Sequence, residues 1–382
     1  MKSRTKQVTL KDYKTFFISH PPMNIFSRYR SQSIIGLSCN PHSRTSAIYV
    51  LTVCPHLFTL HNSSLSKNHS ITMSKILTVF GATGNQGGSI IRAVLADAVL
   101  SKDYKIRGIT RDASKPAAKA LVEKGVDVVS ADMNSKASLA DALKGSHTVF
   151  LVTTPDFMSG GGTQEQTQGK NVTDVSSDVG VKYLIYSSLL HVTEATNGRL
   201  SHVVHFDDKA EVERYIRSKS IPSTFVLPGY FMSNFTALQM IKKGKDGVYS
   251  LAYPVGDKAK FPLVDAESDI GKFVVAAIRN QPMVLGKQIL AAADYYTPAR
   301  IVSEFEEVTG KTARFIPIDA ATYKSFLPEP LADEMLENHL FIEEPGYYAG
   351  RDLRESLDLL ESVGLKPTSW KDFLTANKDA FQ

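Results

Sequence analysis

The run ILTVFGATGNQGGSI, at residues 76–90, constrains the fold of this chain more than any other feature. It begins as an apolar, β-type segment, breaks at Gly81, Gly84 and Gly87, and then resumes with a helical pattern. Glycines between a strand and a helix let backbone N–H groups approach a diphosphate that side chains would otherwise block. The run therefore predicts the first strand, loop and helix of a dinucleotide-binding βαβ unit.

After Met73 short β-type runs alternate with helical stretches, which is typical of a parallel sheet. The predicted strands are Ile76–Phe80, Lys105–Thr110, Val126–Ser130, Thr148–Thr153, Tyr183–Ser187 and Ser223–Leu227. The predicted helices between them are Gly88–Leu100, Lys115–Lys124, Lys136–Leu143, Gln164–Val179 and Val203–Ser218. The predicted fold class is α/β, a Rossmann-type doubly wound parallel sheet with a smaller C-terminal α+β lobe.

The rhythm changes after Pro228, so we assign residues 73–234 to the Rossmann domain and 235–382 to the smaller lobe. In the lobe, the pattern predicts helices at Asp269–Arg279 and Thr297–Thr309 and a strand at Gln288–Ala291. A cleft between the two parts is the expected small-molecule site.

Residues 1–72 differ in composition from the rest of the chain. Residues 1–73 hold nine Lys or Arg and one acidic residue, Asp12, so this segment carries +8 against +5 for the whole chain. The basic balance therefore says little about nucleic-acid binding by the folded part. We interpret residues 1–72 as a disordered leader or a gene-model extension, with a targeting peptide as the alternative. Both cysteines, Cys39 and Cys54, also lie there, which excludes thiolate metal sites and a cysteine nucleophile elsewhere.

The end of the second strand indicates which dinucleotide is bound. An NAD site usually has an acidic residue there, but this chain has Arg111, followed by Lys115. A guanidinium suits a 2′-phosphate, which a carboxylate would repel. The sequence therefore favours NADP(H), with a solvated surface role for Arg111 as the alternative and Asp112 as a neighbouring opposite charge.

A second constellation lies on the helix near residue 205. Short-chain dehydrogenases carry a Tyr-x-x-x-Lys pair on the corresponding helix, and residues four apart share one helix face. This chain has HFDDK, with His205 at the tyrosine position and Lys209 at the lysine position. The preceding strand runs into Ser188, at a place where such enzymes often keep a hydroxyl. For His205 a structural role and a catalytic one are both open, whereas Tyr215 and Lys219, with the same spacing, lie too late in the helix to share the site.

Taken together, the segments VFGATGNQGGS, ITRD, GVKYLIYSS, HFDDKAEVERYI and LPGYFMSNF resemble the NmrA-like family of atypical short-chain dehydrogenases. The resemblance covers residue 73 to the C-terminus and implies NADP(H) on a Rossmann domain completed by a smaller lobe. The glycine-loop contacts that we expect are Gly81, Thr83, Gly84, Asn85, Gln86 and Gly87. The contacts that the resemblance implies elsewhere are Asp132 and Met133 at the adenine, Thr153 and Thr154 along the middle of the cofactor, Lys209 at the ribose, and Pro228, Tyr230 and Phe231 near the nicotinamide.

Two functions follow from the resemblance. Some family members are redox sensors that contact a regulatory protein, and the missing tyrosine favours this class. Others reduce quinones or small carbonyl compounds, and histidine can still donate a proton there because its ordinary pKa is about 6.5. We expect no metal site, no direct nucleic-acid binding and no membrane span, and a cytoplasmic or nuclear location, or a mitochondrial one if residues 1–72 are a presequence.

Overall fold

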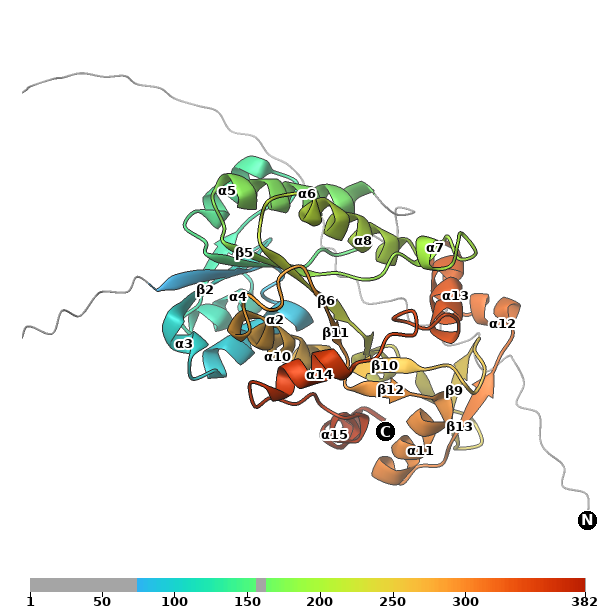
Figure 1. The fold of residues 1–382 in the computed structure, drawn as a ribbon. Helices are drawn as coiled ribbons and strands as arrows, with labels where there is room; N and C mark the ends of the chain where they lie inside the picture. Colours follow the sequence, from blue (N-terminus) through green and yellow to red (C-terminus); the bar gives the residue numbers. More distant parts are fainter. Residues whose placement is uncertain (1–73, 156–162, 382) are drawn as a thin grey trace, which may run out of the picture. The chain divides into compact units, whose positions relative to one another are not determined.

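A parallel sheet of seven strands organises the computed structural model, which describes residues 74–155 and 163–381 (Figure 1). In spatial order the strands are β11 (Gln288–Ala291), β6 (Ser223–Pro228), β5 (Tyr183–Ser187), β4 (Thr148–Leu151), β1 (Lys75–Val79), β2 (Tyr104–Thr110) and β3 (Asp127–Ser130). All neighbouring strands are parallel. The strand order reverses between β1 and β4, and a doubly wound sheet binds its ligand beside the carboxyl ends of strands at such a reversal. The predicted fold class is confirmed, and the glycine run lies at this reversal.

Helices cover both faces of this sheet (Figure 1). On one face α2 (Asn85–Ala96) packs against α10 (Ala266–Arg279), and on the other α6 (Thr163–Asp178) lies between α5 (Lys136–Leu143) and α8 (Val204–Arg217). Shorter helices α3 (Leu100–Asp103) and α4 (Pro116–Val122) complete the connections. Because helices cover both faces, central strands such as β4 are buried along their whole length.

One strand lies in a different place from the one predicted. Gln288–Ala291 has the predicted bounds, but it joins the main sheet beside β6 instead of the smaller lobe. The pattern of a short apolar run identifies a strand without identifying its partner, which depends on tertiary packing. The segment after residue 234 therefore contributes to the large sheet as well as to the lobe. The first helix also differs from its prediction, because α2 begins at Asn85 and not at Gly88, directly inside the glycine run.

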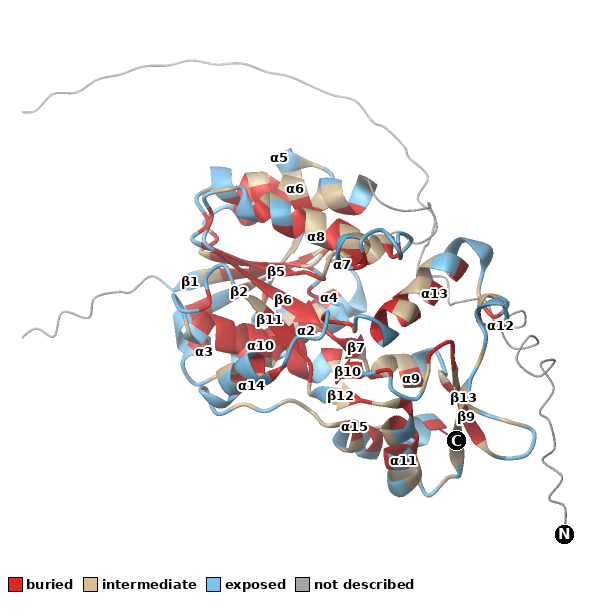
Figure 2. Cartoon of the chain, turned by 45° about the vertical axis from the view of Figure 1, so that its right-hand side comes forward, coloured by how far each residue is buried: buried red, intermediate tan, exposed pale blue. Residues whose placement is uncertain are grey.

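The smaller lobe contains two further sheets and a group of helices. One sheet has the order β12 (Asp294–Tyr296), β10 (Phe261–Val264), β7 (Tyr230–Phe231), and the other β13 (Ala313–Pro317), β9 (Tyr249–Tyr253), β8 (Ile241–Lys243). The helices of the lobe are α9 (Ser233–Ala237), α11 (Pro298–Thr309), α12 (Ala320–Lys324), α13 (Glu329–Glu343), α15 (Trp370–Ala376) and the 3-10 turn η1 (Lys378–Phe381). Two further helices pack on the larger part, α7 (Val192–Ala195) against α8 and α14 (Arg354–Glu361) against α10 and β11. Buried residues run through the large sheet and into the lobe, as Figure 2 shows, and one apolar cluster extends from Phe80 to Phe381.

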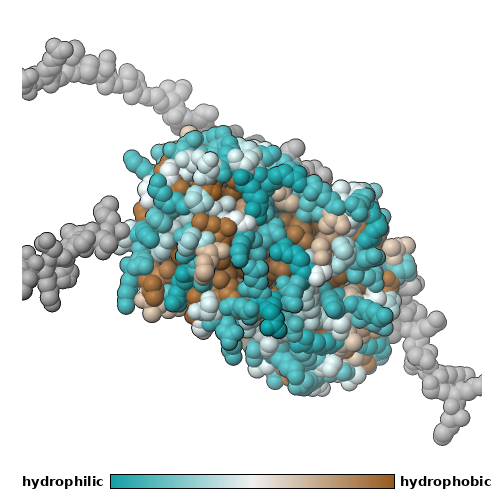
Figure 3. All heavy atoms as spheres, in the orientation of Figure 1, coloured by the Kyte–Doolittle hydropathy of each residue, from teal (hydrophilic) through white to brown (hydrophobic). Residues whose placement is uncertain are grey.

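The surface of the described part is largely hydrophilic on the face drawn in Figure 3. None of the helices in residues 74–155 and 163–381 combines the length and apolar character that crossing a bilayer requires. The predicted leader, residues 1–72, lies outside the described residues.

Candidate dinucleotide site

The glycine run forms a tight cradle between β1 and α2. Gly81 has φ +64°, and a side chain there would begin 2.9 Å from Cγ1 of Val152, next to the end of β4. A Cβ on Gly87 would lie 2.2 Å from the carbonyl oxygen of Gly81, so the helix approaches the loop more closely than any side chain allows. Gly84 is the N-cap of α2, and no side chain caps that helix end. Its first N–H groups are thus available to an anion, as a dinucleotide diphosphate requires.

The other predicted loop residues surround this cradle. Thr83 and Asn85 are exposed, and the side chain of Gln86 accepts a hydrogen bond from Ser187 Oγ at 2.8 Å. Ser187 ends β5, so this bond fixes the start of α2 above the carboxyl edge of the sheet.

Two exposed cations follow β2 at the same edge. Arg111 and Lys115 are both exposed, and the backbone N–H of Ala82 donates to the carbonyl of Ile109 at 3.2 Å, which ties the glycine loop to the end of β2. The carboxylate of Asp112 accepts hydrogen bonds from the N–H and the hydroxyl of Ser114, and these bonds lower its pKa. Asp112 is therefore engaged within its own turn, and the residues at this edge fit a 2′-phosphate.

The predicted adenine edge follows β3. Asp132 is exposed, and its carboxylate accepts from the backbone and side-chain N–H groups of Asn134, both at 2.9 Å. Met133 is half-buried, and its carbonyl accepts from Asn171 Nδ2 at 3.1 Å. The side chain of Met133 packs against the main core, so this short segment is held in place beside the sheet edge.

Lys209 lies at the carboxyl end of β4, in a buried polar network. Its ammonium donates to the carbonyl and the hydroxyl of Thr153 at 3.0 and 3.1 Å and forms an ion pair with Glu165. The hydroxyl of Thr153 donates to the same carboxylate oxygen at 2.6 Å and lies 3.2 Å from the hydroxyl of Tyr186. The structure thus brings the predicted residues Lys209 and Thr153 together, while Thr154 is exposed beside them.

His205, one helical turn before Lys209, is held by a residue of the smaller lobe. Its backbone N–H and its ring Nδ1 both lie against Oε1 of Glu334, at 3.0 and 2.5 Å. His202 has the same arrangement with Glu337, whose two oxygens lie 2.7 Å from the backbone nitrogen and 2.6 Å from Nδ1. Two carboxylates of α13 therefore bind the start of α8, one at His205 in its first turn and one at His202 just before the helix, where the helix dipole favours negative charge.

The remaining predicted residues lie where β5 and β6 end. Ser188 is buried, and its hydroxyl lies 3.4 Å from the carbonyl of Leu189. The carbonyl of Pro228 accepts from the hydroxyl of Tyr347 at 3.2 Å, and Phe231 is half-buried. Tyr230 points into the core.

The surroundings of Tyr230 are aromatic. Its hydroxyl lies 2.9 Å from that of Tyr253, its ring contacts Phe261, and burial raises its pKa to about 12. The side chain of Tyr230 is therefore part of the aromatic core.

The second Tyr-x-x-x-Lys spacing has a structural role. Tyr215 donates to Asp174 at 2.6 Å, and the ammonium of Lys219 lies 3.0 Å from the same carboxylate. Both residues tie α8 to α6, as the packing interpretation of Tyr215 predicts.

One cluster in the described residues has the composition of a metal site. His191 Nε2 lies 3.9 Å from Glu194 and 3.4 Å from Glu211. Arg214 forms ion pairs with both of these carboxylates, at 2.8 and 2.7 Å. The guanidinium of Arg214 therefore already neutralises the negative charge that these carboxylates would present to a metal cation.

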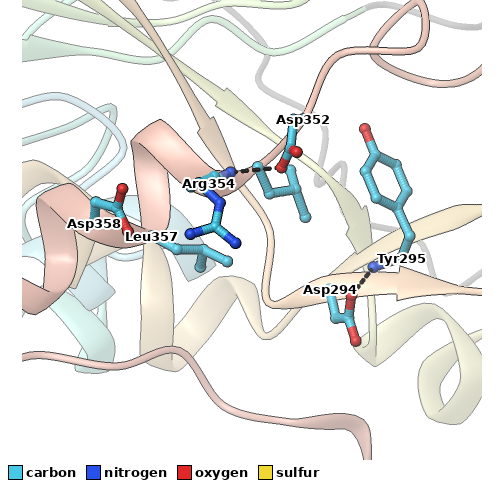
Figure 4. A pocket seen from close by; sticks show the side chains of 7 residues that line it. Asp294, Tyr295, Asp352, Arg354, Leu357 and Asp358 are labelled. Carbon is cyan, nitrogen blue, oxygen red and sulfur yellow. Dashed lines mark hydrogen bonds between the residues drawn. The ribbon is translucent and has the colours of Figure 1, made fainter.

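A separate pocket of about 300 Å³ lies between β12 and the start of α14 (Figure 4). It is lined by Asp294, Tyr295, Asp352, Leu353, Arg354, Leu357 and Asp358. None of these residues belongs to the predicted dinucleotide contacts, and the lining combines charged side chains with the apolar Leu353 and Leu357.

A model of the NmrA-like family matches residues 73–374. The chain belongs to this family. The NmrA-like family domain-containing oxidoreductase malD of Malbranchea aurantiaca is 33% identical over 273 residues, which are 68% of this chain and 79% of that protein. The corresponding oxidoreductase ptmS of Penicillium ochrochloron is 32% identical over 319 residues, 78% of this chain and 92% of that protein.

Solved structures with this NmrA-like fold include a transcriptional regulator and an enzyme. NmrA, a negative transcriptional regulator in complex with NADP, is 20% identical with a TM-score of 0.65, covering 79% of this chain and 94% of NmrA. The NADPH-dependent quinone oxidoreductase QOR2 of Escherichia coli, in complex with NADPH, is 23% identical with a TM-score of 0.64, covering 78% and 99%. At these identities the likeness shows the fold.

Three acidic residues of this NmrA-like chain escape prediction from its sequence. Glu165 and Glu334 contact the predicted residues Lys209 and His205, and Glu337 contacts the nearby His202, but these partners lie 44, 129 and 135 positions apart along the chain. Glu165 carries one weak signal, because it stands in the first turn of a predicted helix. No local spacing points to Glu334 or Glu337.

Proposed function

We propose that this NmrA-like chain binds NADP(H) at the carboxyl edge of its seven-stranded sheet. The observation that carries the proposal is the cradle, in which Gly81 and Gly87 leave no room for a Cβ and α2 presents an uncapped N-terminus. The exposed cations Arg111 and Lys115 at the end of β2 suit the 2′-phosphate. The complexes of NmrA with NADP and of QOR2 with NADPH support the same cofactor.

When bound, NADPH supplies a hydride. The chain's own residues would hold it: the N–H groups of α2 at the diphosphate, Arg111 at the 2′-phosphate, and the segment around Thr153 and Lys209 along its middle. The buried setting of Lys209 would also keep water away from that part of the ligand.

For the use of the cofactor, the geometry favours redox sensing. The two side chains at the dehydrogenase positions, His205 and Lys209, are both engaged, with Glu334 and with Glu165 and Thr153. The contact of Glu334 also connects α8 to α13. A movement of α8 on cofactor binding would therefore be transmitted to the smaller lobe. A dinucleotide shifts such an equilibrium only if it binds the two conformations unequally. The expected partner is a regulatory protein that contacts the lobe.

The second candidate is an NADPH-dependent reductase of a quinone or small carbonyl compound. Its support is the naming of malD and ptmS as oxidoreductases, together with the one-turn spacing of His205 and Lys209. The Nδ1 contact with Glu334 fixes the ring of His205, as a carboxylate does for a histidine that transfers protons through its other nitrogen.

The loss of NADPH absorbance against a panel of quinones and aldehydes separates these candidates. Turnover that disappears in His205→Ala and in Lys209→Ala would assign the reductase. NADP⁺ binding without turnover by the same preparation, with a change in protease cleavage of the lobe on binding, would assign the sensor. A protein that binds neither NADP⁺ nor NADPH would refute both candidates.

A further inference from the structure

Glu165 is an acidic residue with no predicted role, and it is buried beside the middle of the proposed dinucleotide site. It is the third residue of α6, and its side chain is 1% exposed. Its Oε1 accepts the hydroxyl of Thr153 at 2.6 Å and the ammonium of Lys209. Its Oε2 is buried and has no hydrogen-bond partner among the described residues. Because an unpartnered buried carboxylate oxygen costs free energy, a residue chosen for stability alone would be better satisfied than this one.

The position of this carboxylate follows from the sheet edge. The side chain of Val152 lies against Gly81 of the cradle, and Thr153 is the next residue along the chain. Glu165 binds Thr153, so its carboxylate lies beside the segment that follows β4 and contacts the glycine loop through Val152. Any ligand that extends from the cradle along this edge passes the Thr153 segment.

Charge explains why Lys209 needs Glu165. An ammonium has three N–H groups, and here they meet three acceptors: the carbonyl of Thr153, its hydroxyl and the carboxylate of Glu165. Of these acceptors only the carboxylate is charged. The side chain of Lys209 is 8% exposed, and a buried ammonium without an opposite charge is strongly unfavourable.

We infer that Glu165 is a positioning residue that holds the Lys209 ammonium against the end of β4, and that the pair forms the polar floor of the nicotinamide-side half of the dinucleotide site. The inference rests on the proposed binding of NADP(H). It assigns Glu165 to one half of the ligand, because Arg111 and the adenine edge follow β2 and β3, on the other side of β1.

Two ligands separate the two halves in a calorimetric titration of the full chain. NADP⁺ spans the whole site, whereas adenosine 2′,5′-bisphosphate has the adenosine and the 2′-phosphate but no nicotinamide ribose. In Glu165→Gln we expect the Kd for NADP⁺ to rise about tenfold or more, and the Kd for the bisphosphate to stay within about twofold. In a Lys209→Met background the same substitution should add nothing, because Glu165 acts through Lys209.

The control is Glu213→Gln on α8. Glu213 is also buried with an unpartnered Oε2, but its Oε1 binds Arg217 and Gln288, away from Thr153. This variant should bind both ligands as the wild type does. If Glu165→Gln does not fold, Glu165→Asp keeps the charge, and it should bind NADP⁺ more weakly than the wild type and the bisphosphate equally well.

Three results would overturn the inference while leaving the proposed function intact: equal loss of both ligands, no loss of NADP⁺ binding, or an undiminished effect in the Lys209→Met background. A wild-type chain that binds neither ligand would refute the proposed function itself, and this inference with it.

Discussion

One oxygen of Glu334 lies against both the backbone N–H of His205, at 3.0 Å, and its ring Nδ1, at 2.5 Å. The carboxylate comes from α13 of the smaller lobe, and His205 is the second residue of α8, four positions before Lys209. The residue at the expected catalytic position is thus a point of attachment between the lobe and the helix that carries Lys209.

Removing the charge of Glu334 should loosen this attachment. We expect Glu334→Gln to lower the free energy of unfolding by about 1–2 kcal/mol, because it weakens a charge-assisted bond at a helix N-terminus. Urea denaturation measures the change. The control is the neighbouring Asp333→Asn, which removes an exposed ion pair with Lys324 and a weaker interaction with the charge of His202, and it should change stability little. Equal effects of the two variants would contradict the proposed attachment.

Alanine substitutions at two glycines of the cradle should differ in their effect on stability. Gly87→Ala places a Cβ 2.2 Å from the Gly81 carbonyl, so it should cost about 1–3 kcal/mol of stability and also abolish NADP⁺ binding. Gly84 has φ −96°, and a Cβ added there would lie 3.4 Å from its nearest neighbour, the carbonyl oxygen of Gly81. The fold should therefore tolerate Gly84→Ala. The added methyl group would nevertheless stand at the uncapped N-terminus of α2, where we propose that the diphosphate binds, and should weaken NADP⁺ binding. Urea denaturation with a binding titration tests both, and a stable Gly87→Ala variant would disprove the close approach.

Arg111 should determine the preference between the two dinucleotides. We expect Arg111→Glu to weaken NADP⁺ by about tenfold or more and to affect NAD⁺ much less, because only NADP⁺ carries the 2′-phosphate. The matched control is Lys119→Glu, the same charge change at an exposed position of α4. Equal losses for NADP⁺ and NAD⁺ in Arg111→Glu would show that the guanidinium does not bind the 2′-phosphate.

A buried histidine gives the fold a defined response to acid. His339 lies among aromatic rings, with Tyr253 at 4.5 Å and Tyr323 at 5.0 Å between centroids, and its Nδ1–H donates to the carbonyl of Met335 at 2.8 Å. Burial lowers its pKa to about 4. The unfolded chain, with an ordinary pKa near 6.5, therefore binds this proton more readily, and stability should fall as the pH drops from about 6.5 to about 4.

The variant His339→Phe removes this titration. The difference between the unfolded and folded pKa values of His339 corresponds to about 3 kcal/mol of folding stability lost in acid. In urea denaturation the variant should therefore lose correspondingly less stability between about pH 6.5 and about pH 4. His202 gives a contrast of opposite sign, because Glu337 raises its pKa. The contribution of His202 is present in acid and disappears as the pH rises through its folded pKa. Parallel pH profiles of wild type and His339→Phe would contradict the assignment.

Local patterns of the sequence predict the central sheet and one half of the site. The glycines at positions 81, 84 and 87 act over a few residues, and His205 and Lys209 share a helix face, so both features follow from short-range geometry. The place of β11 in the main sheet and the partners Glu165 and Glu334 depend on long-range packing that no local period encodes. Tyr230 shows the same limit, since the motif gives its position in the chain but not the direction of its side chain.

Calorimetric titration of the wild-type chain with NADP⁺ and NAD⁺, each at a low and a high salt concentration, tests the central claim most directly. We predict saturable binding of one NADP⁺ per chain, tighter than that of NAD⁺ and weakened by salt, because the 2′-phosphate meets exposed cations. Absence of NADP⁺ binding, or tighter binding of NAD⁺, would contradict the assignment of this edge of the sheet to NADP(H).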